Sequence, residues 1–401
     1  MNTLPPNAMD TIDTMDAVPD VAEFVQLRRD IHRHPELAFA EHRTSELVAQ
    51  SLSRWGYQVT RGLGGTGVVG QLQRGTGQRR QGLRADMDAL PIEEQTGLPH
   101  ASVHAGVMHA CGHDGHTAML LAAAKQLAGQ GDFSGTLNLI FQPAEEGFGG
   151  AKKMMEDGLF ARFPCDAIFA MHNMPGFKPG QLLFRKGATM ASSENITITL
   201  HGRGGHGAMP QSAADPVVAG ASIVMALQTI VSRNVAPLQM AVITVGSFKA
   251  GQANNVIPQT ATLELSVRSL DRAVRVLLNQ RIQELVQAQA QSYGLRAEIN
   301  FRGGYPVLVN TAAETEFATQ VALELLGPER VEAHTEALTG SEDFAFMLEE
   351  VPGSYLFIGN GDASTGGHGA CMVHNPGYDF DDSNIAVGSA YWVRLAQRYL
   401  V

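Results

Sequence analysis

Thr136-Leu137-Asn138-Leu139-Ile140-Phe141-Gln142 is a short, strongly apolar stretch, typical of a buried β-strand. Before it, residues 114–129 have a helical pattern that opens with an acidic residue, which suits a helix N-terminus. A further apolar run covers residues 82–87. Strand, helix and strand in this order form a βαβ unit, which predicts a largely parallel sheet.

The same alternation continues on both sides of this unit. We expect strands at residues 68–72, 167–171, 181–184 and 355–358. We expect helices at residues 21–33, 44–55, 151–158, 342–349 and 382–399. These elements predict an α/β fold with a mostly parallel sheet and flanking helices.

The middle of the chain has a different order of elements. Strands are expected at residues 195–201, 240–248, 260–268 and 295–301, and helices at 216–232 and 271–293. The resulting β-α-β-β-α-β order is typical of a small two-layer α+β domain. We therefore predict that residues 191–302 form an inserted domain, that 21–190 and 303–401 form one α/β domain, and that 1–20 are a disordered arm.

Composition narrows the class of protein. The 401 residues include 29 Lys and Arg against 40 Asp and Glu, a net charge of −11, which disfavours nucleic acid as a partner. The longest apolar run, residues 217–227, is shorter than the roughly 18 residues that cross a bilayer, so no membrane partner is expected. Three cysteines and an acidic N-terminal stretch without a signal sequence predict a cytoplasmic protein.

The densest group of reactive side chains is His109-Ala110-Cys111-Gly112-His113-Asp114-Gly115-His116, just ahead of a predicted helix. On an extended turn, Cys111 and His113 can both face one metal ion. A structural zinc site would need a second close Cys or His pair, which this chain lacks. The alternative is a set of polar loop residues without a ligand.

Other candidate ligands follow predicted strands. Glu145 and Glu146 come after the strand that ends at Gln142, His172 follows the strand 167–171, and His374 lies in a later loop. Ligands of open α/β sheets bind beyond the carboxyl ends of strands, so these side chains are candidates for one site. Thiolate, imidazole and carboxylate together suit Zn²⁺ or Mn²⁺. The alternative for the two glutamates is a solvated acidic loop.

The glycine-rich segment 62–67 matches a dinucleotide-binding pattern. A strand is expected directly after it, so the phosphate would find no helix N-terminus. We therefore do not expect a nicotinamide cofactor.

Taken together, the motifs resemble those of the dinuclear metal amidohydrolases related to aminoacylase and carboxypeptidase G. Within that family the chain is most similar to the branch of hippurate hydrolases, N-acyl-amino-acid amidohydrolases and auxin-conjugate hydrolases. The resemblance runs from about residue 25 to the C-terminus. It rests on residues 32–37, 84–91, 108–113, 141–147, 201–206, 254–258 and 340–344.

The resemblance implies two divalent metal ions per subunit, Mn²⁺ or Zn²⁺, with Co²⁺ or Ni²⁺ as alternatives. Cys111 would bridge them, and the full implied ligand set is Cys111, His113, Glu146, His172 and His374. Glu145 would carry the proton, and Asp88 would orient the site. Asp86 stands where the wider family has a ligand histidine, which disfavours a peptidase-type ligand set.

The resemblance also implies a role for the inserted domain in a homodimer or homotetramer. His206 and Asn255 would reach the oxyanion across the subunit interface. Arg268 would bind the α-carboxylate of the substrate, although a strand-end surface charge is an equally good interpretation of this residue.

The predicted function is a metal-dependent amidohydrolase that cleaves N-acyl or N-aroyl amino acids, which are small molecules. One alternative is a metallo-aminopeptidase or dipeptidase on the same scaffold. Another is a non-catalytic metal-binding protein, which would be expected to lack Glu145.

Overall fold

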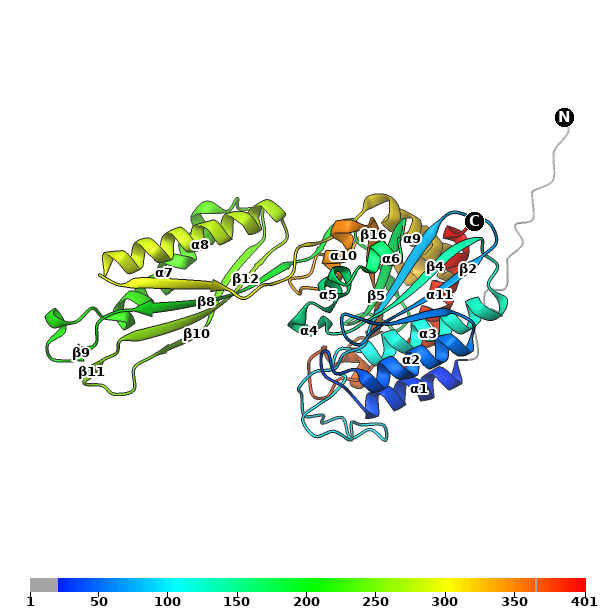
Figure 1. Ribbon diagram of the computed structural model, residues 1–401, viewed down its shortest axis with the longest axis horizontal. Helices are drawn as coiled ribbons and strands as arrows, with labels where there is room; N and C mark the ends of the chain where they lie inside the picture. The colour runs from blue at the N-terminus through cyan, green and yellow to red at the C-terminus, as the bar shows by residue number, and fades with distance from the viewer. Residues whose placement is uncertain (1–20, 365) are drawn as a thin grey trace, which may run out of the picture.

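The computed structural model describes residues 21–364 and 366–401, and it has two lobes built on separate sheets (Figure 1). The predicted arm, residues 1–20, lies outside the described residues. One lobe holds an eight-stranded sheet and the other a four-stranded sheet. The chain leaves the first lobe before Ser192 and returns after Phe301, near the predicted boundaries.

The eight-stranded sheet has the order β1-β2-β4-β3-β5-β16-β6-β15. Its central strands β4, β3, β5 and β16 are parallel, whereas β1, β2 and β6 add antiparallel pairs toward the edges. The strands are β1 (Gln58–Leu63), β2 (Gly67–Arg74), β3 (Arg80–Asp86), β4 (Gly135–Gln142), β5 (Ala167–Pro175), β6 (Leu182–Leu183), β15 (Val331–Glu332) and β16 (Gly353–Gly361). The predicted α/β class with a mostly parallel sheet is confirmed.

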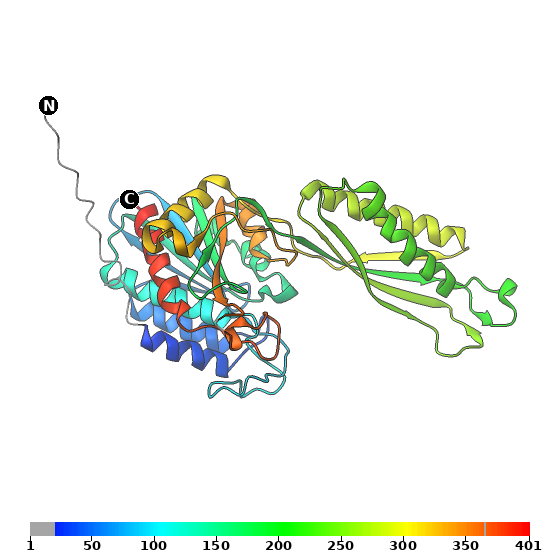
Figure 2. The ribbon, with the colours of Figure 1, turned by 180° about the vertical axis from the view of Figure 1, so that it is seen from behind.

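Helices cover both faces of this sheet. One face carries α1 (Ala22–Arg33), α2 (His42–Arg54), α3 (His113–Gln130), α9 (Ala312–Leu326) and α11 (Asn384–Tyr399). The other face carries α5 (Gly150–Glu156), α6 (Leu159–Arg162) and α10 (Phe344–Glu350). Figure 2 shows α9 and α11 from the opposite side of the molecule. The helix α3 is buried along most of its length, which explains the continuous apolar run of residues 118–124.

The elements of this lobe that the sequence-based prediction missed include α9, β1, β7 (Gly187–Met190) and β14 (Leu308–Asn310). The helix α9 buries Thr315, Ala318 and Ala322, which share one face at helical spacing. That signal was present in the sequence. The segment 62–67 forms the tight turn between β1 and β2, so a strand follows it, as expected, and not a helix.

The strand β5 is longer than predicted. The apolar run predicts an end at Met171, but the strand continues to Pro175 because β16 pairs with it along that length. His172 therefore lies on the strand itself, opposite Phe357, and not in a loop after it.

The four-stranded sheet forms the second lobe. Its elements are β8 (Ser192–His201), α7 (Pro216–Asn234), β10 (Ala241–Ala250), β12 (Thr260–Ser269), α8 (Arg272–Ser292) and β13 (Arg296–Phe301). All its pairs are antiparallel, in the order β10-β12-β8-β13, and α7 and α8 bury their apolar sides against it. The predicted β-α-β-β-α-β order is confirmed. Asp215 and Asp271 cap α7 and α8 by accepting backbone N–H groups.

The helix α7 is apolar over a longer stretch than the run 217–227 alone indicates. It has 19 residues with a mean hydropathy of 1.4, so its length and composition alone would allow it to cross a membrane. A single helix of this kind is weak evidence, because core helices of soluble proteins share these properties. Ala219, Ile223 and Leu227 of α7 are buried in the core of the second lobe.

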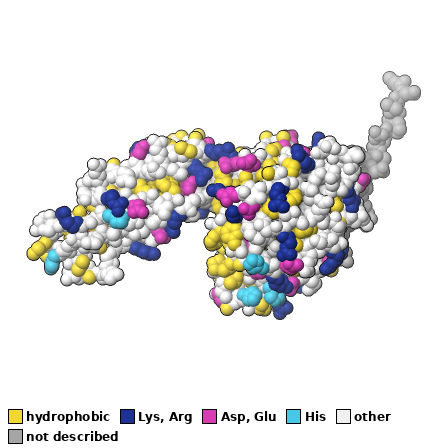
Figure 3. All heavy atoms as spheres, in the orientation of Figure 1, with side chains coloured by type: hydrophobic (Ala, Val, Ile, Leu, Met, Phe, Trp, Pro, Cys, Tyr) yellow, Lys and Arg dark blue, Asp and Glu magenta, His cyan; other side chains and the backbone are white. Residues whose placement is uncertain are grey.

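The small two-stranded sheet of β9 (Gly205–His206) and β11 (Val256–Ile257) lies at the end of the second lobe farthest from the large sheet (Figure 1). The space-filling view shows an open cleft between the two lobes, below the narrow connection (Figure 3). The remaining short elements are α4 (Glu145–Phe148) and the 3₁₀ turns Pro210–Ser212, Pro328–Arg330 and His368–Ala370.

Candidate active site

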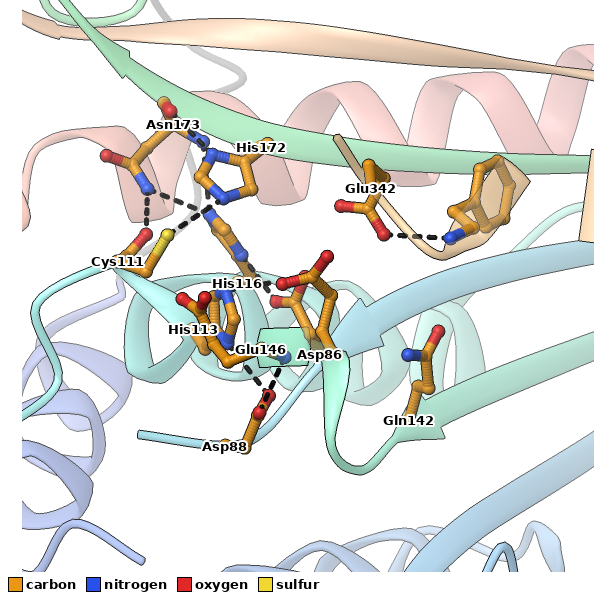
Figure 4. A network of polar contacts seen from close by, with 12 residues as sticks. Asp86, Asp88, Cys111, His113, His116, Gln142, Glu146, His172, Asn173 and Glu342 are labelled. Carbon is orange, nitrogen blue, oxygen red and sulfur yellow. Dashed lines mark hydrogen bonds and ion pairs between the residues drawn. The ribbon is translucent and has the colours of Figure 1, made fainter. Parts of the chain in front are cut away.

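The chemistry-bearing segments converge where β3, β4 and β5 approach the start of α3 (Figure 4). Gly112 makes this approach feasible. Its φ is 86°, and a Cβ atom there would lie 2.2 Å from Nδ2 of Asn173 and 2.6 Å from the hydroxyl of Tyr378. A side chain at this position would collide with both groups, so the backbone between Cys111 and His113 requires glycine.

Cys111 lies at the centre of the candidate ligands. Its Sγ is 3.3 Å from Nε2 of His172, and it forms a group with Glu146 and His374 whose candidate ligand atoms lie within 4.8 Å of one another. Nε2 of His374 is 3.1 Å from Oε1 of Glu146. His374 has a φ of 65°, unusual for a residue other than glycine, and its N–H donates to Ala110 over 2.7 Å.

His113 is oriented by Asp88. Nδ1 of His113 lies 3.1 Å from Oδ1 of Asp88, and the other oxygen of Asp88 accepts the N–H of Glu146 over 3.0 Å. Burial alone would lower the pKa of His113, but Asp86 and Asp88 raise it to about 10. Nε2 of His113 is buried without a hydrogen-bond partner, and it belongs to the group with Cys111 and His172.

His172 presents the correct nitrogen for a ligand. Its Nδ1 donates to the carbonyl oxygen of Asn173 over 2.7 Å, so Nε2, which faces Cys111, keeps its lone pair. Burial and the neighbouring His116 hold the pKa of His172 well below its usual value, and the ring is therefore neutral.

His116 is a member of this network that the sequence analysis did not single out. Its Nδ1 is 2.6 Å from Oδ1 of Asp86, and its Nε2 accepts the N–H of Asn173 over 3.0 Å. Both nitrogens are thus occupied, and Asp86 is also held by Arg84 over 2.6 Å. The spacing of three residues from His113 along α3 was the signal that could have identified His116.

Glu145 lies beside Glu342 and Asp343, with the three carboxylates within 4.8 Å of one another. Burial, reinforced by Glu342 and Glu146, raises the pKa of Glu145 well above its usual value. Such a carboxylate is a stronger base than a solvated one, which suits a residue that takes up a proton.

The donor set fits a bound metal pair. Burial and the nearby Glu146 and Glu145 raise the pKa of the Cys111 thiol, so its thiolate form needs a cation beside it. The neutral His172 offers a lone pair on Nε2, and a cation at the same place would displace the proton from the unpartnered Nε2 of His113. Thiolate, imidazole and carboxylate donors together are typical of sites for transition-metal ions.

A cavity of about 730 Å³ opens onto this cluster. Its lining includes Glu145, Glu146 and His172 from the first lobe, together with Arg268 and Asn195 from the second. Nη1 of Arg268 donates to the hydroxyl of Ser341 over 2.8 Å. Asp88 is buried and does not line the cavity, so its contacts are those of a positioning residue.

The structure does not bring His206 and Asn255 to this cavity. His206 pairs with Val256 in the two-stranded sheet at the far end of the second lobe (Figure 1). Both residues are exposed. Within one chain, the cluster around Cys111 and the tip with His206 are therefore separate.

Cys111 offers a direct test of metal ligation. We expect alkylation of Cys111 to be slow in the metal-loaded protein and faster after chelation, because a bound thiolate is unavailable to the reagent. Peptide mapping would quantify the labelling, with the partly buried Cys165 and Cys371 as internal controls. Equal labelling of Cys111 with and without metal would contradict ligation.

An α/β domain that gathers thiol, imidazole and carboxylate donors around a buried acid defines the class of metal-dependent hydrolases. Residues 82–398 match Peptidase family M20/M25/M40. The chain belongs to this family and is a hydrolase that acts on amide bonds.

Individual relatives cover nearly the whole chain. It is 45% identical to a hippurate hydrolase of Campylobacter jejuni over 96% of this chain and 100% of that protein. It is 37% identical to an N-acetyl-L-cysteine deacetylase of Bacillus subtilis over 94% of this chain and 88% of that protein. A dinuclear metal-binding M20 peptidase of Bacillus subtilis has a similar structure, with a TM-score of 0.80, 32% identity, and coverage of 95% of this chain and 98% of that one.

Proposed function

We propose that this protein hydrolyses the amide bond of N-acyl or N-aroyl amino acids and releases a carboxylic acid and a free amino acid. The observation that carries the proposal is one cavity holding the ligand cluster around Cys111, the buried Glu145 and the cationic Arg268. The relatives named for hippurate and N-acetyl-L-cysteine support an acylated amino acid as the substrate class.

Cys111, His113, Glu146, His172 and His374 would hold two divalent ions, Mn²⁺ or Zn²⁺, or alternatively Co²⁺ or Ni²⁺. When bound, such ions lower the pKa of water and polarise a carbonyl oxygen. Asp88 holds the side chain of His113 and the backbone of Glu146 in place, so it positions two of these five residues.

Glu145 would take the proton from the attacking water and return it to the leaving nitrogen. Its position favours this role, since it lines the cavity and is next to Glu146 in the chain. Asp86 is engaged by Arg84 and His116 and would not act as a ligand, which supports an amidohydrolase over a metallo-aminopeptidase or dipeptidase.

We further propose a homodimer or homotetramer in the cytoplasm. The strand β10 is an edge of the small sheet and pairs only with β12 among the described residues. An unpaired edge is a place where a second chain can add a strand. His206 and Asn255, remote from their own cavity, would then act in the partner subunit's site.

A substrate panel tests the function. Metal-reconstituted protein would be assayed against N-acetyl, N-benzoyl and indole-acyl amino acids, and against dipeptides with a free amino group. We expect release of the amino acid from one or more acylated compounds, with the dipeptides cleaved slowly. Cleavage of dipeptides alone would contradict the proposal.

Arg268 provides a prediction about the amino-acid half of the substrate. Replacement of Arg268 by alanine should raise KM by about 10- to 100-fold, since a charge-assisted pair with a carboxylate is worth about 1.5–3 kcal/mol. The matched control is a substrate whose α-carboxylate is converted to an amide, for which the variant and the wild type should differ little. Equal losses with both substrates would show that Arg268 does not bind the carboxylate.

A further inference from the structure

Tyr305 lies where the chain returns from the small sheet to the large one. Its N–H donates to Oγ of Ser193 over 3.0 Å, and its carbonyl accepts the N–H of Ser193 over 3.0 Å. Ser193 belongs to β8, the segment by which the chain enters the small sheet. Tyr305 therefore ties together the two crossings between the lobes.

The hydroxyl of Tyr305 reaches in the other direction, to the turn that carries Glu145 and Glu146. It donates to the carbonyl oxygen of Glu145 over 2.5 Å, and it accepts the N–H of Gly149 over 3.2 Å. One hydroxyl thus forms hydrogen bonds at both ends of the turn α4. The Tyr305 side chain is itself buried and packs edge-on against the ring of Phe346, 6.0 Å away between centroids.

This turn depends on side chains for its shape. Ala144 and Gly147 have φ values of 53° and 83°, and Glu146 also departs from helical geometry. Glu41 accepts the N–H of Ala144 over 2.9 Å, and Asp88 accepts that of Glu146 over 3.0 Å. Among these partners, Tyr305 is the one that also belongs to the connection between the lobes.

We propose that Tyr305 is a positioning residue that couples the connection between the lobes to the turn carrying Glu145 and Glu146. The proposal rests on the role of Glu145 in the proposed function, because the hydroxyl bonds the turn that carries this residue. Loss of the hydroxyl leaves the carbonyl of Glu145 and the N–H of Gly149 without this partner. The carboxylates of Glu145 and Glu146 are then no longer held in a single position.

The decisive variant is Tyr305→Phe, which keeps the ring and removes both hydrogen bonds. We expect kcat to fall by about 10- to 100-fold, the range associated with displacing a reacting group by a fraction of an ångström to an ångström. KM should stay within about twofold, because Arg268 is bonded to Ser341 and not to the turn. A Tyr305→Phe variant that retains wild-type kcat would overturn the proposal.

Two other tyrosines are matched controls. Tyr57 donates to the carbonyl of Ala124 over 2.9 Å, and Tyr391 donates to that of Ala318 over 3.0 Å. Both side chains are buried, and neither lines the cavity. Tyr57→Phe and Tyr391→Phe remove the same kind of bond and should leave kcat unchanged. If they lower kcat as much as Tyr305→Phe does, the effect is a general loss of packing and the proposal fails.

Hydrogen exchange of the metal-free protein supplies a readout that does not depend on activity. In Tyr305→Phe, amide exchange should accelerate in residues 144–151 and stay unchanged in α3. Ser193→Ala, which removes the bond to the Tyr305 N–H, should give a smaller change at the same residues. Unchanged exchange in 144–151 would overturn the proposal. A wild-type protein that cleaves no acylated amino acid would instead refute the proposed function, while the exchange result still decides the role of Tyr305.

Discussion

Replacement of Glu145 by glutamine is expected to lower kcat by about 10²–10⁴-fold, the usual cost of losing a general acid–base. The amide has nearly the shape of the carboxylate but cannot accept the proton from water. Because Glu145 is buried among Glu342 and Asp343, the substitution also removes one of several repelling charges, so the fold should not be weakened. Metal content and steady-state rates of the same preparation measure both effects.

Glu146→Gln is the matched control, since it changes the adjacent carboxylate in the same way. Glu146 lies 3.1 Å from His374 and is grouped with Cys111, so we expect this variant to lose metal occupancy. Glu145→Gln should keep it. Near-normal turnover in Glu145→Gln would contradict its role as the proton carrier. Full metal binding in Glu146→Gln would contradict its role as a ligand.

The second large effect is expected for His206→Ala, which should be nearly inactive although His206 is remote from the cavity of its own chain. If the residue acts in the partner subunit, mixing His206→Ala with Glu145→Gln builds one complete site per mixed dimer. With random exchange, half of the dimers are mixed and each has one good site of two, so activity should recover to about a quarter of the wild-type value.

Subunit exchange must be demonstrated in the same mixture, for example with two differently labelled chains. Exchange without any recovery would show that His206 acts within its own chain or has no role in turnover. A His206→Ala protein with normal kcat would lead to the same conclusion without mixing.

The alternation of apolar runs and helical patterns was sufficient to predict both sheets and most of their helices. These patterns are local, because each strand or helix buries one side and repeats its apolar residues with the matching period. The predicted end of β5 was wrong because it depends on a contact that is not local. Its extension through His172 to Pro175 depends on pairing with β16, which is far away in the sequence.

The candidate ligands could be named from the sequence because cysteine, histidine and adjacent glutamates are unusual at this density beside predicted apolar strands and helix starts. The residues that hold these ligands in place could not be named in this way. The residues that orient the ligands or the shuttle are Asp88, His116, Arg84, Glu41 and Tyr305, and the last three carry no distinguishing local pattern. A side chain that orients another is recognised only by its contacts.

The sequence by itself determined the kinds of donor available, the α/β class and the β-α-β-β-α-β order of the second lobe. Only the tertiary structure decided which donors meet: His374 and Glu146 are 228 positions apart and come within 3.1 Å. It also decided that His206 and Asn255 lie away from their own cavity. The physical reason is that periodicity encodes which side of an element is buried, whereas the meeting of distant side chains depends on how all the elements pack together.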